Sequence, residues 1–230
     1  MVLTGVRAVS PIDPAHARAV FGVMNDNPER RGAWVQTFTG RKFWPLDPRA
    51  EDVRIEDLAH QLSQVCRYGG ATRRFYSVAQ HCVLVSKCVP RQHARLALLH
   101  DAAEAWIGDM VRPLKYQPEM TNFRIAEQRI EAVVLEAFGV YASPEARRAV
   151  KEIDDRIIVD EIGALMADPP AYWDRLGDIE ALGINVRAQS PRAAEAAFLR
   201  RFLELFPEFD PLPGWLARLG YTLGRLVGVR

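Results

Sequence analysis

The chain has 230 residues, which is enough for one large domain or one domain with an extension and too few for two full-size domains. Hydrophobic residues make up 49% and charged residues 26%, proportions that exclude a disordered or fibrous protein. Thirty Lys and Arg against 29 Asp and Glu give a net charge of +1, so the charge balance excludes a bulk basic field and we expect no stable nucleic-acid partner.

Three cysteines are present, an odd number without C-x-x-C spacing, which indicates neither a disulfide framework nor a thiolate zinc site. The first residues contain no apolar stretch of signal-peptide length, and no segment approaches the ~20 apolar residues of a membrane span. We therefore expect a cytoplasmic protein without a membrane partner.

The segment from Trp34 to Trp44, WVQTFTGRKFW, predicts a small β-hairpin. Aromatic and β-branched residues flank Thr39-Gly40, a dipeptide typical of a short turn between two strands. We assign residues 1–50 to an N-terminal extension that carries this hairpin.

From residue 55 onward the apolar residues recur every three or four positions, which is the period of an amphipathic helix. Serines with capping potential, prolines suited to the first turn and glycines that end the pattern divide this region into segments. The predicted helices cover 55–68, 77–90, 90–107, 121–138, 143–166 and 191–206. The fold class is therefore mainly α, a helical bundle over 51–206 with a C-terminal tail over 207–230, all forming one structural unit.

The most informative segment begins with His100-Asp101 and includes Glu104, directly after the apolar run LALL. Three ionisable side chains within five residues of a mostly buried helix are costly unless another charge neutralises them, and a divalent cation does this well. His100 and Glu104 are four residues apart and share a helix face. The segment thus predicts part of a metal site.

Further ligands would have to come from other helices. His81 lies among apolar neighbours on the preceding predicted helix, and Asp154 lies on the fifth. Two imidazoles and two carboxylates suit a first-row divalent metal and are too rich in nitrogen for calcium. Register alone leaves open whether Asp154 or Asp155 faces the core.

The series His81, His100-Asp101 and Asp154 resembles the H…HD…D pattern of the HD-domain metal-dependent phosphohydrolases. The chain is most similar to the bacterial 5′-deoxynucleotidase branch of that superfamily. The stretch HDAAEAWIGDMVRPLK carries the HD-x-x-E-x-x-x-x-D signature of the branch followed by Pro and Lys, and VKEID matches its last acidic ligand, which favours Asp154 over Asp155. The resemblance covers about residues 55–166 and implies an HD-type helical domain.

The resemblance also implies a role for individual side chains. The expected metal ligands are His81, His100, Asp101 and Asp154. The expected catalytic residues are Glu104, which would orient or deprotonate the attacking water, and Asp101. The expected substrate-binding residues are Arg67 on the phosphate, Asp109 on a sugar hydroxyl, and Tyr68 and Lys115.

Two further features bear on the metal and the substrate. Between Asp101 and Asp154 there is no histidine, whereas binuclear relatives add histidines in this interval, so we expect one divalent ion (Mn, Co, Fe, Zn or Mg) and disfavour a cyclic-dinucleotide phosphodiesterase. Tyr68 stands where the branch has Trp, and Gln80 stands where a Glu often precedes the first ligand. The chemistry is thus better defined than the substrate.

The expected function is hydrolysis of a nucleotide, a 5′-(deoxy)nucleoside monophosphate, to nucleoside and phosphate. Removal of triphosphate from a dNTP is an alternative within the same class of enzyme. A nucleotide-binding module that kept the metal site without catalysis is an alternative of another class. The resemblance further implies a homodimer.

Overall fold

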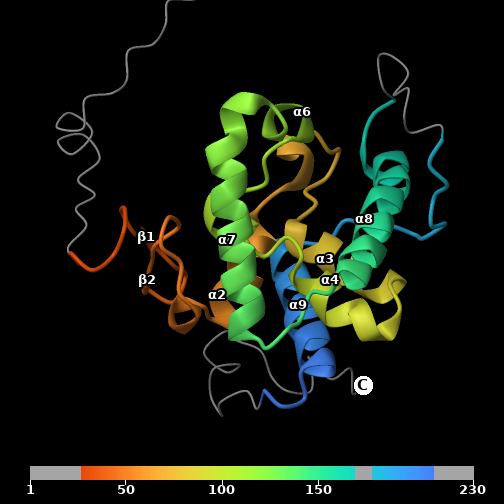
Figure 1. Cartoon of the computed structure of the whole chain (residues 1–230). Coiled ribbons are helices and arrows are strands. Elements are labelled where there is room, and N and C mark those ends of the chain that lie inside the picture. The colour runs from red at the N-terminus through yellow and green to blue at the C-terminus, as the bar shows by residue number, and fades with distance from the viewer. Residues whose placement is uncertain (1–26, 169–177, 210–230) are drawn as a thin grey trace, which may run out of the picture.

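The computed structural model describes residues 27–168 and 178–209. This part of the chain is mainly helical, with a small two-stranded hairpin on its N-terminal side, which confirms the predicted fold class (Figure 1). The first 26 residues of the predicted extension and the last 21 residues of the tail lie outside the described residues. No helix in the described ranges has the length and apolar character that crossing a membrane requires.

The predicted hairpin is present and is fastened to the helical domain. Strands β1 (Val35–Gln36) and β2 (Lys42–Phe43) pair antiparallel around a turn in which Gly40 has a φ of +80°, a conformation that glycine adopts without strain. The Thr39 backbone amide and hydroxyl donate to the two carboxylate oxygens of Asp57, at 2.7 and 3.0 Å. These bonds fix the hairpin against the first helix.

The helical elements follow in chain order: η1 (Ala50–Asp52), α2 (Ile55–Gln64), η2 (Arg67–Gly70), α3 (Val78–Cys88), η3 (Arg91–His93), α4 (Ala94–Leu99), α5 (Glu104–Ile107), α6 (Arg112–Lys115), η4 (Pro118–Met120), α7 (Thr121–Ala137), α8 (Pro144–Leu165) and α9 (Pro191–Leu205). The predicted starts of α3, α8 and α9 are confirmed, because Ser77, Ser143 and Ser190 each accept a hydrogen bond from the backbone amide three residues further on.

The first predicted helix is shorter than expected. Helix α2 ends at Gln64, four residues before its predicted end, because the chain then turns into a β-bridge between Cys66 and Ser77. The Arg67 amide donates to the Tyr76 carbonyl at 2.9 Å in the same bridge. The residues that follow α2 form η2, and this places Arg67 beside the start of α3.

The third predicted helix is divided into η3, α4 and α5. Between α4 and α5 the backbone hydrogen bonds span three residues: the Ala102 amide donates to Leu99 and the Glu104 amide donates to Asp101. Such bonds tighten the turn relative to an α-helix. Helix α5 ends where predicted, at Gly108, whose φ is +76°.

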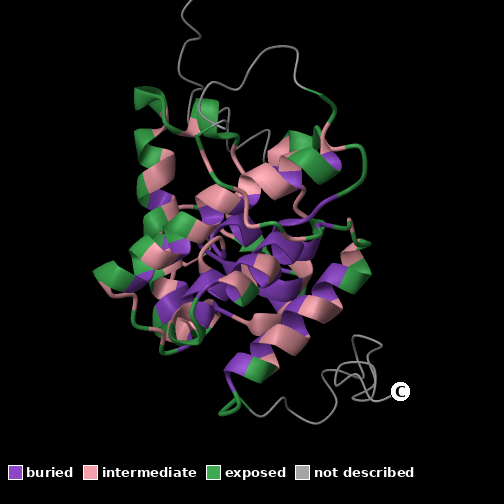
Figure 2. Ribbon diagram, turned by 90° about the vertical axis from the view of Figure 1, so that its right-hand side faces the viewer, coloured by how far each residue is buried: buried purple, intermediate pink, exposed green. Residues whose placement is uncertain are grey.

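Helix α9 packs against α2, α3 and α4 (Figures 1 and 2). Buried residues concentrate along these contacts, and Leu58, Leu98 and Phe198 are fully buried there. A link outside the helices also fixes α3: the Gln80 side chain donates to the Arg187 carbonyl at 2.6 Å and accepts from the Gln189 amide at 3.0 Å. Helix α3 is therefore held on several sides.

Candidate metal centre

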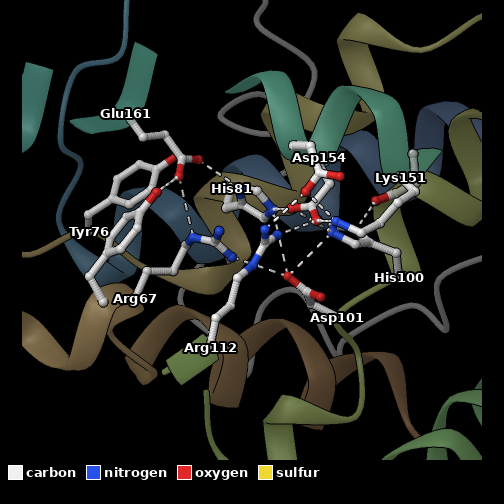
Figure 3. Close-up of polar contacts among 12 residues, drawn as sticks. Arg67, Tyr76, His81, His100, Asp101, Arg112, Lys151, Asp154 and Glu161 are labelled. Atoms are coloured by element: carbon white, nitrogen blue, oxygen red, sulfur yellow. Dashed lines mark hydrogen bonds and ion pairs between the residues drawn. The ribbon is translucent and has the colours of Figure 1, made fainter. Parts of the chain in front are cut away.

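Three parts of the fold meet at one point and bring together the four predicted metal ligands (Figure 3). His81 comes from α3, His100 and Asp101 from the tight turn between α4 and α5, and Asp154 from α8. We refer to these four side chains as the His–Asp cluster. His81 is fully buried, and the other three side chains are 12–19% exposed.

The distances bring His81, His100 and Asp101 close enough together for one cation, and Asp154 lies beside them. The His81 Nε2 atom lies 3.6 Å from Asp101 Oδ2 and 3.2 Å from Asp154 Oδ1, and the His100 Nε2 atom lies 3.3 and 3.9 Å from the same oxygens. Ligands bound at about 2.0–2.2 Å from one ion are themselves about 3.0–3.5 Å apart. One ligand atom each from His81, His100 and Asp101 lies within 4.8 Å of the other two, so these three residues could hold a metal ion.

Both imidazoles are held with the same nitrogen facing the cluster. The Nδ1 atom of His81 lies 2.6 Å from a Glu161 carboxylate oxygen, and that of His100 lies 2.8 Å from the Ala97 carbonyl oxygen. Because both partners accept, each Nδ1 donates its proton to them, so in the neutral imidazole it is Nε2 that presents a lone pair to the cluster. Both Nε2 atoms are buried without a hydrogen-bond partner. Metal-binding histidines present a lone pair in this way.

The electrostatics of the cluster favour positive charge at its centre. Burial alone would raise the pKa of Asp154, but the adjacent imidazoles of His100 and His81 lower it well below its usual value. Burial would lower the pKa of His100, but Asp101 is the main group that raises it instead. Both pKa shifts have the same cause: the carboxylates of the cluster attract positive charge to its centre.

Structure distinguishes Asp154 from Asp155, which register alone did not. The Asp154 carboxylate is 12% exposed and faces the imidazoles, whereas Asp155 is 38% exposed and bonds Arg112 and Lys151 at the surface. Arg112 also donates to the second oxygen of Asp154 at 2.9 Å. Nothing in the sequence analysis pointed to Arg112, because its helix, α6, was not predicted.

Glu161 is the second residue at this centre that sequence reasoning missed. Its side chain is fully buried on α8 and accepts hydrogen bonds from His81, from Tyr68 and from Tyr76. Burial would raise the pKa of Glu161, but His81 and Arg67 lower it to about 2. The available signal was its spacing: Glu161 follows Asp154 by seven residues, which is two helical turns, so both lie on one face of α8.

Glu104 and Asp109, predicted for catalysis and sugar binding, lie beside the His–Asp cluster. Glu104 is 3% exposed, and its Oε2 atom has no hydrogen-bond partner. Burial first, and then the negative charges of Asp101 and Asp109, raise its pKa well above the usual value. Burial likewise raises the pKa of Asp109, which accepts a hydrogen bond from the Tyr68 backbone amide.

The remaining predicted substrate residues have different surroundings. Arg67 is 8% exposed and donates to Asp101 at 3.2 Å, so it borders the cluster directly. Tyr68 follows it with a φ of +58°, a strained conformation for a residue other than glycine, and its hydroxyl turns to Glu161. Lys115 instead forms an ion pair with Glu127 at 2.6 Å.

A cavity of about 310 Å³ reaches the His–Asp cluster between α4, α7 and α8. Its lining includes His100 and Asp154 together with five residues that were not predicted as site residues: Leu96, Glu131, Arg147, Val150 and Lys151. A cavity of this size is within the range that accommodates a small ligand. The cluster is therefore next to space that a ligand could enter.

Fold and site together define a class: a helical protein whose central helices carry a buried histidine–aspartate group able to hold a metal ion. The chain belongs to the same family as the uncharacterized protein YfdR of Escherichia coli K12, to which it is 36% identical over 174 residues, covering 75% of this chain and 96% of YfdR. It is also 33% identical over 184 residues to an uncharacterized protein of Rhodobacter capsulatus, covering 74% of this chain and 93% of that protein. No family model matches the chain.

Proposed function

We propose that this protein is an HD-type, metal-dependent phosphohydrolase that cleaves a 5′-(deoxy)nucleoside monophosphate to nucleoside and phosphate. The observation that carries the proposal is the pair of buried imidazole Nε2 atoms, on His81 and His100, that have no hydrogen-bond partner and lie among carboxylate oxygens. Burying two such nitrogens without a hydrogen bond is costly, and one divalent ion would satisfy both.

Residues around the His–Asp cluster supply the other requirements of phosphate hydrolysis. A divalent ion (Mn, Co, Fe, Zn or Mg) would polarise the phosphoryl oxygens and make water more acidic. Glu104 would take up the proton of the attacking water on its unpaired Oε2 atom. Arg67, whose guanidinium borders the cluster at Asp101, would donate to the phosphoryl oxygens as negative charge builds on them.

Substitution of Glu104 by Gln tests the enzymatic proposal. Because Glu104 lies outside the His–Asp cluster, Glu104→Gln should bind Mn²⁺ as the wild type does. Phosphate release from nucleoside monophosphates should fall at least about 100-fold, since the amide cannot accept the proton. Glu195→Gln changes a buried glutamate on α9 in the same way and should leave both measurements unchanged.

A substrate screen decides between this proposal and its alternatives. Wild-type protein is incubated with nucleoside mono- and triphosphates and with each of the five metals. Phosphate release from monophosphates supports the proposal, and triphosphate release from dNTPs would replace it by the triphosphohydrolase alternative. Release of neither product with any metal would replace it by the catalytically silent binding module.

We further propose that the protein is cytoplasmic and that it forms a homodimer. Gel filtration tests the homodimer by the mass of the particle.

A further inference from the structure

The carboxylate of Glu161 has two oxygens, and each serves a different half of the site (Figure 3). The Oε1 atom accepts from His81 Nδ1 at 2.6 Å and from the Tyr76 hydroxyl at 2.8 Å. It therefore sets the orientation of an imidazole in the His–Asp cluster. Tyr76 is itself fully buried, so this arrangement is isolated from solvent.

The Oε2 atom faces the side of the site where the phosphate is expected. It accepts from the Tyr68 hydroxyl at 2.5 Å and lies 3.5 Å from Arg67 Nε. The far end of the same guanidinium donates to Asp101 at 3.2 Å. Arg67 is thus held at one end by Glu161 and at the other by a member of the cluster.

We propose that Glu161 is a positioning residue that couples metal binding to phosphate binding, because one rigid carboxylate orients His81 for the ion and Arg67 for the phosphate. The phosphate half of this inference rests on the function proposed above, whereas the metal half needs only that the His–Asp cluster binds a divalent ion.

The coupling follows from how little freedom the carboxylate has. Each oxygen is held by a tyrosine hydroxyl as well as by its functional partner, so the group cannot turn toward His81 without drawing away from Arg67. Partners of metal-binding histidines commonly change metal affinity 10–100-fold when they are removed. Coupling between two binding sites is reciprocal, so an ion that fixes His81 should also strengthen phosphate binding.

The experiment measures binding rather than turnover. Affinity for Mn²⁺ alone is measured by electron paramagnetic resonance, and affinity for inorganic phosphate is then measured by calorimetry at saturating Mn²⁺. Glu161→Gln should weaken both, the first by at least about tenfold. The control is Glu195→Gln, because Glu195 is also a buried glutamate beside a histidine, His60 at 3.3 Å, but lies outside the site. It should bind both ligands as the wild type does.

Two conservative variants test the metal side and the phosphate side of Glu161 separately. Both keep the carboxylate, so they remain informative if Glu161→Gln does not fold. Tyr76→Phe releases Oε1 and should weaken Mn²⁺ more than phosphate. Tyr68→Phe releases Oε2 and should weaken phosphate more than Mn²⁺. Wild-type affinities for both ligands in Glu161→Gln, or in both tyrosine variants, would overturn the inference.

The same preparations separate this inference from the proposed function. If wild type binds Mn²⁺ and phosphate and the variants weaken both, but no nucleotide is hydrolysed, the coupling stands and the hydrolase proposal fails. If wild type hydrolyses nucleotides while the variants bind both ligands normally, the coupling alone fails. Failure of wild type to bind phosphate at saturating Mn²⁺ also overturns the coupling.

Discussion

The hydroxyl proton of Tyr76 is held by a buried hydrogen bond to Glu161. The Tyr76 ring has no exposure to solvent. Burial, followed by the negative charge of Glu161, raises the pKa of Tyr76 well above its usual value. The folded protein therefore retains this proton at a pH where the unfolded chain would lose it.

This retention predicts a loss of stability in alkali. An unfolded tyrosine titrates near pH 10, so Tyr76 contributes fully to the free energy of unfolding below that pH, and its contribution falls as the pH rises further. The expected slope for this one group is about 1.4 kcal/mol per pH unit above pH 10. Urea unfolding between pH 8 and 11 should show a steeper decline for wild type than for Tyr76→Phe. Parallel curves would contradict the assignment.

The residues that could be predicted are those whose identity and spacing carry the chemistry. His81, His100, Asp101 and Asp154 could be chosen because ionisable groups in apolar helices need a partner, and the structure places these four together. Glu161 could not be chosen on the same ground, since all its partners except His81 come from the bridge and turn after α2, which have no periodic signal.

Gln80 illustrates a departure from the resembled pattern that the structure explains. Its side-chain amide donates through nitrogen and accepts through oxygen, to two residues of the segment that precedes α9. A glutamate at this position could accept from the Gln189 amide but, when ionised, could not donate to the Arg187 carbonyl. These two hydrogen bonds therefore explain why glutamine, and not glutamate, stands at position 80.

At the scale of elements, the short helix α5 depends on how it ends. Gly108 has a φ of +76° and a ψ of 163°, a region that glycine almost alone occupies. Apart from its two chain neighbours, no residue comes within 4 Å of the position that a Cβ would occupy, so the restriction comes from the backbone and not from crowding. The chain direction after Gly108 places Asp109 next to the site.

Two alanine substitutions should therefore act in opposite directions. Gly108→Ala should lower the free energy of unfolding by about 1–3 kcal/mol, because alanine is strained at this φ and ψ. Gly163→Ala should raise it by about 0.5–1 kcal/mol, because Gly163 is an exposed position inside α8 with room for a methyl group. Urea unfolding measures both, and equal shifts of the same sign would contradict the backbone explanation.

Element boundaries could be predicted wherever the signal is local. The caps at Ser77, Ser143 and Ser190 act through the next three residues, so the starts of three helices follow from sequence alone. The division between α4 and α5 could not be predicted. The residues of the tight turn between these helices have ordinary helix propensity, so nothing in their identity marks the break. The end of α2 depends on a bridge to Ser77, which is a non-local pairing.

For the whole molecule, the His–Asp cluster joins α3, the turn between α4 and α5, and α8, and its members lie up to 73 residues apart, from His81 to Asp154. An ion bound there would connect these parts in the folded state, and the unfolded chain has no comparable site. Metal binding should therefore stabilise the domain as a unit.

We expect Mn²⁺ at 100 times its dissociation constant to raise the free energy of unfolding by about 2.7 kcal/mol, and EDTA to reverse the effect. Asp154→Asn should lose most of this stabilisation, because it removes an oxygen facing the imidazoles. Its neighbour offers a matched control: Asp155→Asn alters a surface ion pair and should respond to Mn²⁺ as wild type does. Equal responses of the two variants would place the ion elsewhere.

The two hydrogen bonds between Gln80 and residues 187 and 189 have a consequence for newly made chains. The neighbour of His81 is anchored by a segment synthesised more than 100 residues later, and α9, which follows that segment, packs against α3. A polypeptide that terminates before this point lacks the surface against which α3 is seated, although all four members of the cluster have already been translated. Truncated products should consequently be unable to assemble the centre, and the ion would be acquired only after α9 has been synthesised.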